Sequence, residues 1–409
     1  MTSNLLAALK SNQGKTTAAV VNPLIEAAKQ GSVEKCQAAL LEPKVKLDQK
    51  DTEGMTALMH AAIQGCIPMV QFLVEKGARI SSKDDGGETA LMKACKEGNK
   101  DIMKFLLSAQ LAQKKRGGPL GGGGDLQKLM AAEKRRVLDA KDDEGVTAVM
   151  KASEQGEADI MKDLLEEGAT LEMKDDEGWN VLMWAALAGH NEIVETLVNH
   201  YEVAAEYTTE KGENALMKAS ANGHWEVCDF LLEKKAKVNQ VDTENQTALM
   251  WAAAEGHLLT VKGLINKDAK IDLVTKAGKT ALLLAAQFGR DEVCKFLISN
   301  GAKVDHQDAE GHTALFGAVQ AGNHMLCETL IAKKCPLEAR TTSFQTALMW
   351  GALHQQLQCV QVLISTGAQI HSVDENGKKA VDHAEATLNS HVVEELREAA
   401  KRQPVPDDH

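Results

Sequence analysis

The chain has 409 residues, of which 44% are hydrophobic but only 3% aromatic, and its formal net charge is −12. Its core must therefore be built mainly from Ala, Leu, Met and Val, and the acidic balance argues against a nucleic-acid-binding protein, which needs a basic face. No apolar run approaches the roughly 20 residues that a transmembrane helix needs, so we expect no membrane insertion.

The N-terminal residues carry no clear pattern, and we expect 1–22 to be a partly disordered extension. A short apolar patch lies near Met1 without a basic region before it, so a secretory signal is not expected. Pro23 suits the first turn of a helix and Gly31 separates two helical runs, which predicts a capping unit from Pro23 to Leu41.

A stretch such as Thr247-Ala248-Leu249-Met250-Trp251-Ala252-Ala253 recurs along the rest of the chain. The threonine position repeats every 33 residues, apart from one step of 34 and one of 58: Thr56, Thr89, Thr147, Asn180, Asn214, Thr247, Thr280, Thr313, Thr346 and Lys379. A period this regular indicates a repeat array, in which each unit is stable only when it is stacked on its neighbours.

The unit itself predicts two short helices. An Asp-x-x-Gly turn precedes a helix that we expect from Thr147 to Gln155 in one copy, and Gly156 ends this helix in a left-handed conformation. A second helix follows with Ile160, Met161 and Leu164 at helical spacing. Small alanines in the first helix allow neighbouring units to approach closely.

The unit Asp-x-x-Gly-x-Thr-Ala-Leu-Met-x-Ala-Ala-x-x-Gly-His resembles the ankyrin repeat from about Pro23 to Leu396. This resemblance implies an all-α ankyrin-repeat solenoid of about eleven stacked helix-turn-helix units with short hairpin turns, spanning 23–397, and we expect 398–409 to form a disordered tail. It also implies that a His ties neighbouring turns together where this chain usually has Met. We expect these methionines to fill the inter-repeat core by shape, in a looser stack.

The step of 58 marks an insertion of 25 residues in the third unit, at about 108–132. We expect an extended second helix, a mobile Gly-rich loop, and an amphipathic return helix with Leu126, Leu129, Met130 and Val137 on one face. A hinge, a partner-binding loop and a tolerated surface insertion all remain open. Basic triplets at 114–116 and 134–136 are interpreted by default as a solvated loop; the alternatives are a two-part nuclear import signal and a docking patch.

Catalytic and cofactor motifs are absent from the sequence. Gly14-Lys15-Thr16 and Gly278-Lys279-Thr280 resemble the end of a P-loop, but the glycine required five residues earlier is missing from both. His190, His224 and His257 share one repeat position, where a packing role is favoured over metal binding. We therefore expect no enzyme, and no catalytic residue, cofactor, metal or small-molecule substrate.

Five of the eight cysteines occupy apolar positions of predicted second helices: Cys36, Cys228, Cys294, Cys327 and Cys359. Small buried thiols are favoured over a metal or redox role. Unpaired cysteine in this number fits a reducing compartment, and we expect a cytoplasmic protein.

The ankyrin resemblance implies that partners bind the concave face, formed by the turns and the exposed side of each first helix. The residue after the methionine, here called the slot position, varies most: His60, Lys93, Lys151, Trp184, Lys218, Trp251, Leu284, Gly317 and Trp350. Exposed apolar side chains in the fifth to tenth repeats are the predicted partner-binding residues: Trp179, Trp184, Leu187, Trp251, Phe288, Phe344, Trp350 and Leu353. Packing of the rings between repeats is the alternative.

Phe344 stands where other turns have Gly. Because Phe is unfavourable at positive φ, we expect this turn to be remodelled and to present the ring. The whole pattern predicts a non-catalytic protein-protein interaction scaffold or adaptor. The alternative is a regulatory or assembly subunit of a larger multiprotein enzyme complex, which the size of the native assembly would reveal.

Overall fold

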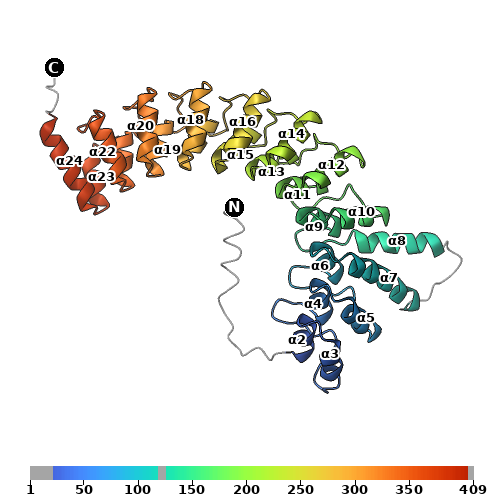
Figure 1. The fold of residues 1–409 in the computed structure, drawn as a ribbon. Coiled ribbons are helices and arrows are strands. Elements are labelled where there is room, and N and C mark those ends of the chain that lie inside the picture. The colour runs from blue at the N-terminus through green and yellow to red at the C-terminus, as the bar shows by residue number, and fades with distance from the viewer. Residues whose placement is uncertain (1–21, 118–125, 404–409) are drawn as a thin grey trace. The chain divides into compact units, whose positions relative to one another are not determined.

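The computed structural model describes residues 22–117 and 126–403. Within these ranges the chain is a series of helix pairs, and the only strand-like pairings are two isolated bridges, Lys83 with Thr89 and Lys141 with Thr147 (Figure 1). The predicted all-α repeat solenoid of stacked helix-turn-helix units is therefore confirmed.

Each repeat contributes a short first helix and usually a longer second helix. The first helices are α2 (Pro23–Lys29), α4 (Ala57–Ile63), α6 (Ala90–Lys96), α9 (Ala148–Gln155), α11 (Val181–Ala188), α13 (Ala215–Ala221), α15 (Ala248–Glu255), α17 (Ala281–Gln287), α19 (Ala314–Gln320), α21 (Ala347–Leu353) and α23 (Ala380–Ala386). The second helices are α3 (Val33–Leu40), α5 (Ile67–Glu75), α7 (Lys100–Gly117), α10 (Ala158–Glu166), α12 (Asn191–Asn199), α14 (Trp225–Glu233), α16 (Leu258–Asn266), α18 (Asp291–Ser299), α20 (His324–Ala332), α22 (Leu357–Ser365) and α24 (Ser390–Arg402).

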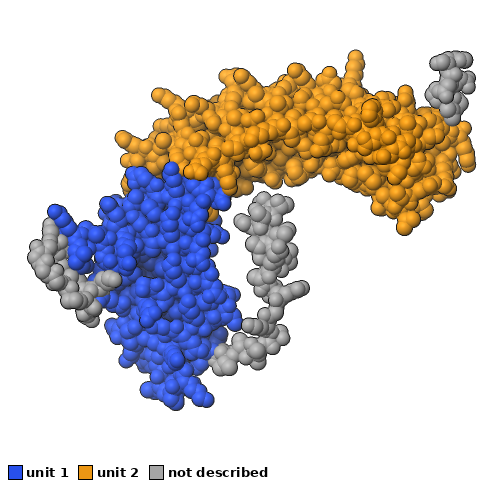
Figure 2. Space-filling model, turned by 180° about the vertical axis from the view of Figure 1, so that it is seen from behind, with its two compact units in different colours: residues 1–181 blue, residues 182–409 orange. Residues whose placement is uncertain are grey.

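The chain divides into two compact units, unit 1 (residues 1–181) and unit 2 (residues 182–409), which Figure 2 shows in blue and orange. In unit 1, the first helices α2, α4, α6 and α9 pack on one another in chain order, and α3, α5 and α7 form a second row. In unit 2, one row runs from α13 to α23 and the other from α12 to α24.

Each first helix begins where the sequence predicts. The threonine before the helix is an N-cap: Thr247 Oγ1 accepts the backbone N–H of Met250 at 3.2 Å, and Thr89 does the same for Met92 at 3.3 Å. Gly156 ends α9 at φ +87°, which a residue without Cβ adopts with little strain.

The core between repeats is built from methionine and alanine. The methionines before the slot positions are all buried: Met59, Met92, Met150, Met183, Met217, Met250 and Met349. The expectation that they fill the inter-repeat core is confirmed. Burial also raises the pKa of the Cys228 and Cys294 thiols to about 12, so both remain protonated at neutral pH.

Neighbouring turns are tied together by their backbones. The N–H of Asp85 donates to the carbonyl of Glu53 at 3.1 Å, and the equivalent bond joins Thr243 to Lys211 at 2.8 Å. The same bond recurs at Asp143, Asp176, Lys276, Ala309, Thr342 and Glu375. The connection between turns therefore does not depend on a histidine side chain.

The insertion in the third repeat has the predicted helical parts. The second helix α7 is extended to Gly117, and the return helix α8 (Leu126–Leu138) packs beside it, while the Gly-rich loop at 118–125 lies outside the described residues. Lys100 and Lys104 of α7 hold Asp163 of α10 at 3.1 and 2.8 Å. Leu129, however, is exposed, so the predicted apolar face of α8 is wrong at this residue.

The C-terminal helix α24 continues to Arg402, past the array boundary predicted at Arg397. Polar side chains of α24 support this extension, because Arg402 reaches Glu398 one turn earlier at 3.4 Å. Residues 1–21 and 404–409 lie outside the described residues.

Candidate functional site

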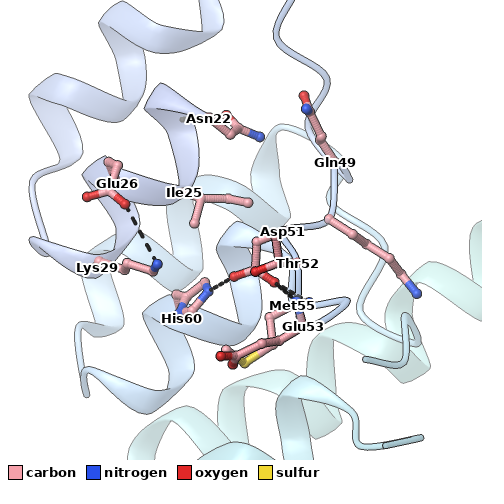
Figure 3. A pocket seen from close by; sticks show the side chains of 11 residues that line it. Asn22, Ile25, Glu26, Lys29, Gln49, Asp51, Thr52, Glu53, Met55 and His60 are labelled. Carbon is pink, nitrogen blue, oxygen red and sulfur yellow. Dashed lines mark hydrogen bonds and ion pairs between the residues drawn. The ribbon is translucent and has the colours of Figure 1, made fainter. Parts of the chain in front are cut away.

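In unit 1 the slot side chains bind the turn that precedes their own helix. His60 Nε2 lies 2.8 Å from Asp51 Oδ2 (Figure 3), and Lys93 Nζ lies 2.8 Å from Asp84 Oδ2. In each case the carboxylate stands nine residues before the base. Lys151 and Asp142 repeat this arrangement at 2.8 Å.

Glu88 joins two of these pairs into one network. Its carboxylate is in ion-pair contact with both Lys93 and Lys151, and all three side chains are mostly buried. Burial alone would raise the pKa of Glu88, but hydrogen bonds from the two ammonium groups outweigh it and lower the pKa. Burial alone would lower the pKa of each lysine, and its carboxylate partners raise it instead. The network is therefore charged at neutral pH.

A hollow of about 500 Å³ lies beside His60 at the N-terminal end of unit 1 (Figure 3). Its lining contains both acidic and basic side chains, and Glu26 pairs with Lys29 at 3.7 Å along helix α2. Asp51 is held by backbone N–H groups of its own turn as well as by His60. Most of the charge around this hollow is therefore satisfied within the protein.

In unit 2 most slot positions hold apolar or small residues. Trp251 and Trp350 are partly exposed, Leu284 is almost buried, and Gly317 has no side chain. Lys218 and His383 are exceptions, because Lys218 contacts Glu213 at 2.7 Å and His383 lies 2.9 Å from Asp374, as the bases of unit 1 contact their turns.

Two tryptophans show how the rings pack. Trp225, on second helix α14, lies so close to α16 that a Cβ on Gly263 would be 2.2 Å from its ring. Trp350, on first helix α21, contacts the rings of Phe316 and His354 at centroid distances of 6.0 and 4.9 Å. Packing between repeats therefore accounts for Trp225 and for part of the Trp350 surface.

The other predicted partner-binding residues of unit 2 have different degrees of exposure. Phe288 and Phe344 are 54% and 55% exposed. The remaining side chains are partly exposed: Trp184, Leu187, Trp251 and Leu353. Trp179 is also partly exposed and lies in unit 1, in the turn before α11.

The turn at Phe344 is not remodelled, so that prediction is wrong. Phe344 adopts φ +60°, and its N–H bonds to the Thr341 carbonyl at 2.9 Å, as Gly311 does to Asp308 at 3.0 Å. The hydrogen bonds of the repeat turn outweigh the strain of a left-handed Phe. The ring is nevertheless exposed, as expected.

A second hollow of about 240 Å³ lies among α17, α19 and α21 of unit 2. It is lined by Lys279, Leu283, Gln287, Asp308, Glu310, His312, Thr313, Phe316, Gly317, Gln320 and Trp350. Of these residues, the sequence singled out only Trp350 as a binding residue. The sequence feature that could have indicated this hollow is Gly317, the one slot position without a side chain.

Above this hollow, aromatic rings form a cluster. His312 lies 5.0 Å from Trp350 and 5.3 Å from Phe316, in edge-to-face arrangements. Trp350 Nε1 and His354 Nε2 are buried and have no hydrogen-bond partner among the described residues. Burial lowers the pKa of His354, which keeps it neutral at physiological pH.

The histidines after the helix-ending glycines bridge successive repeats. His224 Nε2 lies 3.1 Å from the Leu187 carbonyl, and His257 Nε2 lies 3.0 Å from the Ala221 carbonyl. Across the described residues, no three His, Cys, Asp or Glu side chains gather where they could hold a metal ion. None of the described helices is long and apolar enough to cross a bilayer.

These features define a class of protein: a helical repeat solenoid whose variable side chains line the turns and first helices. A family model described as ankyrin repeats (3 copies) matches residues 5–116, 123–207, 202–275, 235–308, 261–341 and 282–374. The chain belongs to the ankyrin repeat family, whose repeats are protein-protein interaction modules and are typically non-catalytic. Comparison with curated proteins gives no match.

Proposed function

We propose that this protein is a non-catalytic scaffold or adaptor that binds a partner protein on the turn and first-helix face of unit 2. The observation that carries the proposal is the contrast at the slot positions. In unit 1, His60, Lys93 and Lys151 are engaged by carboxylates of the turns. In unit 2, the slots at Trp251 and Trp350 present partly exposed rings on the same side of the repeat.

The exposed residues have the chemistry of interface anchors. Trp and Phe bring a large apolar area with few rotatable bonds, and such residues dominate the binding free energy at many interfaces. Phe344 supports the proposal further, because an exposed ring in a strained backbone conformation contributes nothing evident to the fold. We also propose a cytoplasmic location, which the free and mostly buried cysteines support.

The proposal is tested with a partner captured from native cells by affinity purification and identified by its peptides. Replacing Trp184 and Trp251 together with Ala is expected to weaken binding by at least a few kcal/mol, or roughly a hundredfold in Kd, because two anchors are removed. The measurement is titration calorimetry of wild type and double variant.

The matched control is Leu259→Ala, which removes an apolar side chain that is 60% exposed on second helix α16. This variant is expected to bind like wild type. If the double variant retains the partner while its circular dichroism is unchanged, the proposed surface is wrong.

A further inference from the structure

The hollow of unit 2 lies where one repeat departs from the others at two adjacent positions. Phe316 occupies the buried methionine position, and Gly317 occupies the slot. A Cβ on Gly317 would lie 2.7 Å from the backbone nitrogen of Gln287, so α19 packs closely on α17 only because the slot is a glycine. Gly317 therefore contributes only backbone to the lining of the hollow.

The lining of this hollow is mostly polar, with an apolar and aromatic part on one helix of each of three repeats. Leu283 and Phe316 line it from α17 and α19, and Trp350 lines it from α21. The ring contacts of Trp350 with His312, Phe316 and His354 fix the indole from several sides. The hollow is thus a preformed cavity rather than a gap between mobile side chains.

The polar part of the lining carries more negative than positive charge. Asp308 is held in place, since Oδ1 accepts the N–H groups of Glu310 and His312 at 3.0 and 2.9 Å. The Glu310 side chain is 77% exposed and lies 3.6 Å from His312. Lys279 is the one ammonium group in the lining, and it donates to Gln287 at 2.8 Å. Glu310 is consequently available to a cation from outside.

We propose that this hollow receives one basic side chain, Lys or Arg, from an extended segment of the partner protein. The inference rests on the proposed function and specifies what its surface recognises. The aliphatic stem would lie along the partly exposed Trp350, and the charged head would meet Glu310 beside Asp308. The volume of about 240 Å³ suits a single long side chain, and the chain's net charge of −12 favours a basic partner.

The test selects random dodecapeptides displayed on phage against the full-length protein. Enriched peptides are expected to share a Lys or Arg at one position, and changing that residue to Gln should weaken binding about tenfold because the charged contact is lost. Glu310→Gln in the protein should weaken the same peptides several-fold. Affinities are measured by fluorescence polarisation of labelled peptides.

The matched control is Glu244→Gln. Glu244 holds the same turn position in another repeat, and its side chain is 67% exposed. Peptide affinity should be unchanged in this variant. Equal losses in the two variants would indicate general attraction to an acidic surface and would overturn the proposal.

Two further outcomes would also overturn it. Enriched peptides that lack a shared basic residue but lose binding in the Trp184→Ala, Trp251→Ala variant would refute the basic pocket and leave the proposed function standing. Absence of any enriched peptide would refute the pocket as well. Calorimetry with the captured native partner then decides the proposed function independently.

Discussion

The same helical position is buried and ionic in one repeat and apolar in another, and its surroundings decide which. Lys151 is mostly buried and paired with Asp142 and Glu88, whereas Trp350 is partly exposed and packs against the ring of His312. A lysine in a sequence pattern is therefore not evidence of a solvated surface. Its role depends on the carboxylates that the fold brings to it.

Part of this pairing could be predicted from the sequence. The spacing of nine residues between the turn Asp and the slot base occurs again in the last repeat, where Asp374 meets His383 at 2.9 Å. The second contact of Glu88, with Lys151, could not be predicted in this way. This contact joins two repeats that are separated in the sequence by the insertion. The distance between the two side chains is set by how the repeats pack and not by their separation in the sequence.

Replacing Glu88 with Gln is expected to lower the free energy of unfolding by about 2 kcal/mol at pH 7, because two buried ammonium groups each lose one carboxylate. The pKa of Glu88 is lowered in the folded protein, so its contribution is present above the unfolded pKa of about 4.3 and is lost as pH falls through the folded pKa. Urea unfolding from pH 7 to pH 3 should therefore show the difference between wild type and variant shrinking below about pH 4.

Glu53→Gln is the control, since Glu53 lies exposed in the preceding turn. A difference for Glu88→Gln that stays constant down to pH 3 would contradict the role assigned to its charge.

The helices themselves follow from local signals. The predicted helix from Thr147 to Gln155 is present as α9, with Thr147 as its N-cap and Gly156 as its left-handed end. The turn at Phe344 was mispredicted because intrinsic φ preference amounts to only about 1–2 kcal/mol, which the hydrogen bonds of a repeated turn exceed. Packing partners such as Trp225 and Gly263 were missed, since a helical period shows which face is buried but not what lies against it.

The contact between α14 and α16 predicts that one substitution changes the free energy of unfolding in opposite directions in two backgrounds. Gly263→Ala should destabilise the protein by about 1–2 kcal/mol, because overlap with the Trp225 ring exceeds the gain in helix propensity. In a Trp225→Ala background the same substitution should stabilise it by up to about 1 kcal/mol, since only the propensity term is left. Urea unfolding of the four proteins completes the double-mutant cycle. Effects of equal sign and size in both backgrounds would show that the ring and the glycine do not interact.

At the scale of the whole molecule, stability is spread along a line of neighbour contacts. The repeats of α2–α3 and α23–α24 each pack against one neighbouring repeat, while repeats inside a unit, such as α4–α5 and α15–α16, pack against two. The sequence period predicts this arrangement, but it continues almost unchanged through Val181, where the division into two units falls. That division depends on how residue contacts are distributed in three dimensions, and the repeat period carries no information about this.

All five tryptophans lie between residues 179 and 350, so their fluorescence reports mainly on interior repeats, whereas circular dichroism reports on every helix. Because end repeats lose fewer contacts when they open, helical signal should begin to fall at a lower urea concentration than tryptophan signal. Coincident curves would indicate a single cooperative transition and contradict this expectation.

The backbone bonds between turns have a consequence for how such a chain evolves. Most turns bring one N–H and one carbonyl to their neighbours, regardless of which side chains they carry, as the bonds at Asp85 and Thr342 illustrate. A duplicated gene segment of one period would therefore arrive with both of its connections already formed. Its slot residue could then mutate without breaking the backbone hydrogen bonds between turns. The array could therefore lengthen and acquire new binding residues by the same genetic event.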